Sequence, residues 1–117
     1  MLMDYNAKLQ QKGERTMSLL LREYSLISEA MIEKDGSLLD LLMSVDNVLK
    51  NSELTDRQWL CIKKHYILGI PQLEIARRLN VSQPTINEHI REGLRKISKQ
   101  AIKEGFLGEL YRRYGIY

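Results

Sequence analysis

Amide and guanidinium side chains recur along one short stretch, SQPTINEHIRE, which runs from residue 82 to residue 92. Gln83, Asn87 and Arg91 are spaced four residues apart, so a helix would present them on one face. An amide offers a donor and an acceptor side by side, as adenine requires, and a guanidinium matches guanine or a phosphate. This pattern predicts hydrogen bonding to base edges rather than bond-making chemistry.

The same stretch supplies the predicted contacts to bases, and basic residues around it supply predicted contacts to phosphates. Glu88 can either accept from cytosine or repel the backbone. Phosphate contacts add affinity but carry no sequence information. The base-facing candidates are Ser82, Gln83, Pro84, Thr85, Asn87, Glu88 and Arg91, and the phosphate candidates are Lys63, Lys64, Arg77, Arg78, Arg95 and Lys96.

Two helices joined by a very short turn are needed to position these side chains. We predict a short helix over residues 72–79, a turn at 80–82, and a longer helix from residue 83 to about 99 or beyond. Ala76 is small enough for a close helix crossing, Asn80 tolerates positive φ, and Ile86 locks the second helix onto the first. The rest of the buried side is expected to comprise Ile75, Leu79, Val81, Ile90, Leu94 and Ile97.

A strong helix start precedes this unit. Thr55 and Gln58 have the spacing of a capping box, and Leu54 and Trp59 have that of a hydrophobic staple. The helix is expected to end at Gly69, which can adopt the left-handed conformation. It should bury Leu60, Cys61, Ile62 and Tyr66, and Pro71 suits the first turn of the helix that follows.

The first 53 residues form a predicted helical hairpin. A helix-like segment covers residues 4–34, with Gly13 expected to fray or break its early part, because glycine is unfavourable inside helices. A turn at 35–36 leads to a second helix over residues 37–50 that packs antiparallel on the first. One apolar stripe lies along the first helix and comprises Met17, Leu20, Tyr24, Ile27 and Met31. It can either pack into the core of the chain or form an interface with a second copy or with RNA polymerase.

Composition and charge limit the possible fold class and the possible partners of the chain. The two prolines lie where helices can begin and no segment alternates as a strand does, so we expect an all-α fold. Residues 1–53 carry six Lys/Arg against nine Asp/Glu, and residues 54–117 carry twelve against six. The basic part suits double-stranded DNA, and the acidic, apolar part suits a protein partner. We divide the chain into an N-terminal arm (1–53), a DNA-binding domain (54–104) and a tail (105–117). Five apolar residues of the tail are available to pack back as a short helix: Phe106, Leu107, Leu110, Tyr111 and Tyr114.

Other classes of function find no support in the sequence. The single cysteine, Cys61, excludes an internal disulfide, and the Cys and His residues lack metal-ligand spacing. No apolar run is long enough to span a membrane, and the first residues lack the apolar core of a signal peptide. No nucleophile, base and orienting group assemble at plausible spacing. We therefore expect a cytoplasmic protein that is not an enzyme and uses no metal or cofactor.

The segment LTDRQWLCIKKHYILGIPQLEIARRLNVSQPTINEHIREGLRKI, residues 54–97, resembles region 4 of sigma-70-type factors. The family pattern combines LT-x-R-Q, an apolar helix, G-x-S/P-x-x-E-I-A-x-x-L-x-V/I-S, T-V/I and a basic tail. The resemblance implies a helix-turn-helix that binds DNA, as do small stand-alone regulators of phages and prophages. At the positions of Gln83, Pro84 and Glu88, the family usually has a basic residue, a Glu and a Gln, respectively. The family's recognition of the −35 promoter element is therefore not expected of this chain.

Two hypotheses follow for the chain as a whole. The first is a sequence-specific transcriptional regulator, acting as a dimer on half-sites about one turn, ~10 bp, apart. The second is a protein-interaction module that binds RNA polymerase or a sigma factor and redirects transcription. The sequence leaves open the operator, activation versus repression, and the role of the terminal RRYGIY.

Overall fold

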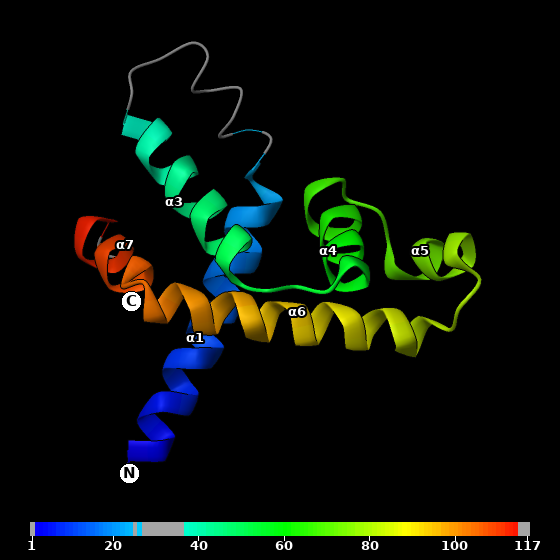
Figure 1. Cartoon of the computed structure of the whole chain (residues 1–117), viewed down its shortest axis with the longest axis horizontal. Coiled ribbons are helices and arrows are strands. Elements are labelled where there is room, and N and C mark those ends of the chain that lie inside the picture. The colour runs from blue at the N-terminus through cyan, green and yellow to red at the C-terminus, as the bar shows by residue number, and fades with distance from the viewer. Residues whose placement is uncertain (1, 25, 27–36, 115–117) are drawn as a thin grey trace.

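A computed structural model describes residues 2–24, 26 and 37–114 of the chain. Within that part every regular element is a helix, so the predicted all-α fold is confirmed (Figure 1). The predicted turn at 35–36, the interface candidates Ile27 and Met31, and the end of the tail lie outside the described residues. The elements are α1 (Leu2–Arg22), α3 (Ser37–Asn51), α4 (Asp56–Ile62), the π-helical η1 (Lys63–Ile67), α5 (Gln72–Leu79), α6 (Gln83–Lys103) and α7 (Phe106–Tyr114).

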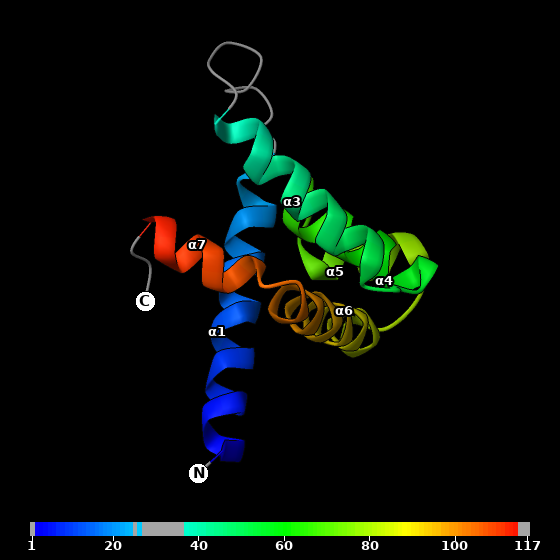
Figure 2. The same cartoon turned by 60° about the vertical axis from the view of Figure 1, so that its left-hand side comes forward.

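Helix α6 is the element on which the others assemble. Helices α4 and α5 lie on one side of it, and α1 runs steeply across it rather than alongside (Figures 1 and 2). Helix α3 runs antiparallel to the second half of α1, in agreement with the predicted hairpin (Figures 1 and 2). The Tyr24 hydroxyl donates a 2.8 Å hydrogen bond to Asp46 and ties the end of the first segment to α3.

Gly13 lies at the crossing of α1 over α6, and our expectation that it would break the helix was wrong. A Cβ at Gly13 would overlap the Ser98 hydroxyl oxygen and lie 2.7 Å from Leu107 Cδ1. The Ser98 hydroxyl donates to the Gln10 carbonyl oxygen at 2.9 Å and so links the two helices at the same point. The cost of glycine in a helix is offset here because only glycine permits this close approach.

The apolar stripe on the first helix divides between core and surface. Met17 is completely buried within the chain, together with Leu21, Val45 and Val48. Met17 therefore cannot contact a second copy, and its proposed interface role is corrected. Leu20 and Tyr24 are half-buried against the same core. The intramolecular alternative accounts for the buried part of this stripe.

The predicted start of α4 and the predicted stop at Gly69 are both found, but the last turns before Gly69 are not α-helical. Thr55 and Gln58 form both hydrogen bonds of the capping box, each 3.1 Å long. The α-helix gives way at Lys63 to a π-helical turn, in which the Leu68 amide donates to the Lys63 carbonyl oxygen at 3.0 Å. Gly69 then adopts a φ of 71°, as predicted. Cys61 and Ile62 are fully buried, but Leu60 and Tyr66 are only half-buried.

The crossing at Gly13 predicts opposite effects for one substitution at two glycines. Gly13→Ala should lower the free energy of unfolding by about 1–3 kcal/mol, because Ser98 cannot move away without losing its bond to Gln10. Gly108→Ala is the control, since a Cβ there meets nothing within 4 Å in α7. It should stabilise by up to about 1 kcal/mol through helix propensity. Urea unfolding followed by circular dichroism measures both, and equal effects at the two sites would contradict the close crossing.

Candidate nucleic-acid interface

The turn between α5 and α6 has the geometry that its sequence predicts. Asn80 adopts the left-handed conformation, with φ 57° and ψ 45°. The Ser82 side chain accepts a 3.3 Å hydrogen bond from the Thr85 amide and caps α6, with Pro84 in the first turn. Pro71 occupies the N-cap of α5 in an extended conformation, one position before the predicted first turn. The two helices are therefore fixed relative to each other by backbone and capping interactions.

Packing beneath the turn is close where the sequence predicts it. Ala76 and Ile86 are buried, and Ile75 and Ile97 are fully buried. Val81 is 38% exposed, and its expected burial was wrong. It lies in the turn itself, where the backbone curves away from the core to begin α6. Leu79 is half-buried, and Ile90 and Leu94 are buried as predicted.

The two helix starts together line a shallow hollow of about 410 Å³. All seven base-facing candidates are exposed, and five of them line this hollow together with Gln72: Gln83, Pro84, Asn87, Glu88 and Arg91. Within the described part of the chain, Arg91 forms no ion pair, so its guanidinium can donate to a base or a phosphate. The Ser82 and Thr85 hydroxyls lie 2.8 Å apart and serve the helix cap.

Gln72 is a residue of this hollow that the sequence reasoning missed. Its side-chain oxygen accepts a hydrogen bond of 3.4 Å from the Asn87 amide nitrogen. An amide nitrogen carries two hydrogens, so Asn87 keeps one donor and its oxygen for a base. The sequence did offer a signal for Gln72, namely its place at the first position of α5. Gln72 therefore orients the side chain that the sequence nominates as an adenine reader.

The six residues predicted to contact phosphates differ in the partners that they have within the chain. Arg77 and Arg78 both pair with Glu74, at 3.4 Å and 3.1 Å. Arg95 donates to Glu92, and the hydrogen bond from this guanidinium lowers the pKa of the Glu92 carboxyl below its ordinary value. These pairs are exposed, and such pairs exchange readily with water or other anions.

The lysines among those candidates point to other parts of the molecule. Lys96 donates to the Gln58 side-chain oxygen at 2.9 Å and to the Glu53 carbonyl oxygen at 3.5 Å, so it clamps α4 onto α6. Lys63 lines a separate hollow between α3 and α4 that also contains Trp59. Lys64 is half-buried on η1. The structure thus brings the base-facing candidates together but spreads the phosphate candidates over several surfaces.

No group of three His, Cys, Asp or Glu side chains suited to a metal ion occurs among residues 2–24, 26 and 37–114. His65 is occupied within the fold, because its Nδ1 lies 2.9 Å from the Ile70 carbonyl oxygen. In the described part of the chain, no helix combines the length and apolar character needed to cross a membrane.

Comparison with known families identifies the recognition unit. A family model described as sigma-70, region 4 matches residues 52–99, which are fewer than half of the residues of the chain. The matched segment contains α4, η1, α5 and most of α6, and it includes every residue that lines the hollow at the two helix starts. The predicted resemblance is therefore confirmed, and residues 52–99 form a helix-turn-helix segment of the sigma-70 region 4 type. No curated protein and no solved structure matches the chain.

Proposed function

We propose that this protein is a sequence-specific, DNA-binding transcriptional regulator that inserts the start of α6 into the major groove. The observation that carries the proposal is the exposed hollow in which Gln72, Gln83, Asn87 and Arg91 converge at the starts of α5 and α6. These are groups that pair with base edges in the major groove. The sigma-70 region 4 match over the same residues supports the coarser assignment to DNA binding.

In the proposed mechanism, contacts to phosphates supply affinity and contacts to bases supply sequence specificity. Cations on and around α6 attract the phosphates, and binding releases condensed counterions, so affinity should fall steeply with salt. Asn87, oriented by Gln72, then pairs with adenine, and Arg91 pairs with guanine or anchors a phosphate. Neither step requires a cofactor, and we propose no catalytic activity. We place this action in the cytoplasm of a bacterial cell, with the protein on the nucleoid when it is bound to DNA.

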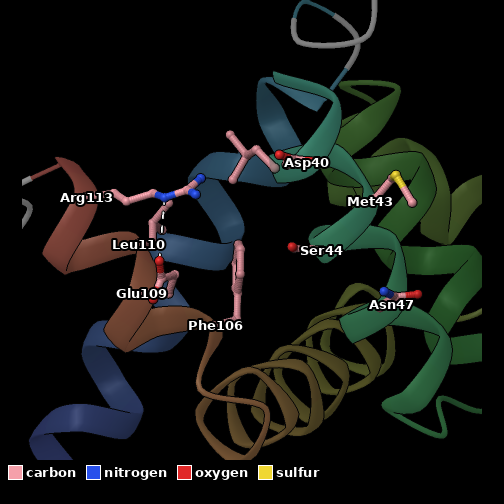
Figure 3. A pocket seen from close by; sticks show the side chains of 9 residues that line it. Asp40, Met43, Ser44, Asn47, Phe106, Glu109, Leu110 and Arg113 are labelled. Carbon is pink, nitrogen blue, oxygen red and sulfur yellow. Dashed lines mark ion pairs between the residues drawn. The ribbon is translucent and has the colours of Figure 1, made fainter. Parts of the chain in front are cut away.

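We propose further that the regulator acts as a dimer through α3 and α7. A hollow of about 370 Å³ lies between these helices, and Phe106 extends into the space between them (Figure 3). On α3, Leu39 and Met43 are 43% and 54% exposed and are four residues apart, so they form one apolar ridge. A two-fold axis would place the ridge of each copy in the hollow of the other.

Charge at the rim of this hollow favours a second copy as its occupant. Asp40 lies on the α3 side, and Arg113 lies on the α7 side, where it pairs with Glu109 at 3.5 Å (Figure 3). In a two-fold arrangement each rim meets the opposite charge of the other copy. A dimer built in this way would present two recognition helices to half-sites about one helical turn apart.

The DNA-binding proposal predicts distinct effects for two arginines. Arg91→Ala should weaken binding to a selected site by about 1–3 kcal/mol and relax preference at one base pair, because a bidentate contact is lost. Arg15→Ala is the matched control, since Arg15 is exposed on α1, outside both the recognition segment and the α3–α7 face. The site is first selected from a pool of randomised duplexes, and affinities are then measured by fluorescence anisotropy.

A different class of function would give a different result in the same experiment. If the wild-type chain binds no DNA at low salt, the regulator proposal fails. If it instead captures RNA polymerase or a sigma factor, and capture survives Arg91→Ala and Asn87→Ala, the alternative interaction module is correct. The hollow between α3 and α4, with Trp59 36% exposed at its edge, is the surface that such a partner would use.

The dimer proposal predicts that Met43→Glu converts a dimer into a monomer, because the substitution places a charge on the apolar ridge. Light scattering measures the solution mass. The cooperativity of DNA binding by the two copies should be lost together with the dimer. Leu19→Glu is the control, since Leu19 is 62% exposed on α1, outside both the α3–α7 face and the recognition segment. A wild-type monomer at all concentrations used, or a dimer that survives Met43→Glu, would contradict this arrangement.

A further inference from the structure

A second basic hollow lies on the C-terminal half of α6, away from the recognition surface. It measures about 410 Å³ and is formed against the corner between α3 and α4. Its lining comprises four cations and one carboxylate, together with neutral polar groups: Arg95, Lys96, Lys99, Lys103, Glu53, Asn51, Ser52 and Gln100. This excess of positive charge indicates a surface for a polyanion.

The cations form a continuous series with the recognition surface. Arg91 lines the hollow at the start of α6, and Arg95, Lys99 and Lys103 follow it at intervals of four residues. Side chains at this spacing lie along one slowly turning stripe of a helix. The stripe therefore leads from the recognition surface directly into the basic hollow.

Two of these cations are available for a ligand. Arg95 pairs with Glu92, and Lys96 is held by Gln58 and the Glu53 carbonyl oxygen. Lys99 and Lys103 are exposed and form no ion pair or side-chain hydrogen bond with any part of the chain that the structure describes. Their ammonium groups can each take a phosphate oxygen without breaking an internal contact.

The corner that forms the opposite wall is held in a defined position. Glu53 adopts a left-handed φ of 54°, which is uncommon for a residue with a side chain. Its carbonyl oxygen accepts from Lys96, and the neighbouring Ser52 is buried. The wall of the hollow is thus fixed to α6 rather than being a loose loop.

We propose that this hollow binds the phosphate backbone of the DNA duplex beside the recognised site, with Lys99 and Lys103 as the contacting residues. The inference rests on the proposed DNA-binding function. Helix α6 has 21 residues, about 30 Å, whereas the major groove is about 12 Å wide. When the first turns of α6 occupy the groove, its second half extends past the groove edge, where phosphates lie. The flanking duplex is therefore the polyanion that this stripe is placed to meet.

The test compares the double variant Lys99→Ala/Lys103→Ala with Lys8→Ala/Lys50→Ala, which removes the same charge from exposed positions on α1 and α3. Binding is measured from 50 to 200 mM salt on two duplexes. One carries the selected site with about 10 bp on each side, and the other is trimmed to the site. Each lost phosphate contact should reduce the salt slope by about 0.9, so the affinity of the Lys99/Lys103 variant on the long duplex should fall roughly tenfold less over this range than that of the wild type.

The proposal also predicts what should stay constant. Base preference should be unchanged in the Lys99/Lys103 variant, and the difference from wild type should shrink on the trimmed duplex. A slope equal to that of the control variant would overturn the proposal, as would an equal change on both duplexes. Loss of binding to heparin or RNA with an unchanged slope on DNA would also overturn it. Absence of DNA binding by the wild-type chain would instead refute the proposed function itself.

Discussion

Two close crossings hold α1 and α4 against α6. At Gly13 the backbone of α1 approaches Ser98, and at Gly93 a Cβ would overlap Ile62 Cδ1 of α4. Both crossings depend on the absence of a side chain, and both occur on the helix that also begins with the recognition residues. Because α6 is held at two such points, its first turns are presented in a fixed direction. Seven of its residues are buried: Ile86, Ile90, Gly93, Leu94, Ile97, Ser98 and Ala101.

This arrangement explains how one helix can serve both as core and as recognition element. The buried residues lie on one side of α6, and the polar and charged residues lie on the other. Asn87 and Arg91 are exposed next to the buried Ile86 and Ile90. Burying an isoleucine side chain contributes about 1.5–3 kcal/mol, so the apolar side fixes the helix without using the reading side chains. Substitutions on the exposed face can therefore alter the proposed recognition surface while the fold persists.

Local signals in the sequence predicted the recognition unit well. The capping box at Thr55 and Gln58, the left-handed Asn80 and the Ser82 cap each depend on neighbours within a few residues, and each is found as predicted. The six predicted helices follow from apolar periodicity and from the positions of glycine and proline. The base-facing candidates could also be predicted from periodicity, because the buried face of an amphipathic helix determines the exposed one.

Features that depend on distant parts of the chain were not predictable from local patterns. Gly13 was taken for a helix breaker because its partner Ser98 lies 85 residues away in sequence. The sequence left Met17 with two possible roles, core or partner interface, because its burial depends on the packing of several elements. The bond from Asn87 to Gln72 and the clamp from Lys96 to Gln58 also join separate helices. These contacts decide which side chains are free to meet DNA.

The proposed function requires that DNA contacts the hollow at the starts of α5 and α6. The most direct measurement is an NMR titration of the labelled chain with a selected duplex, in which amide and side-chain shifts are followed residue by residue. We expect the largest changes at Gln72 and residues 83–91, including the side-chain amides of Asn87 and Gln83. Changes confined to α3, α4 and Trp59, with residues 83–91 unperturbed, would contradict the proposed function.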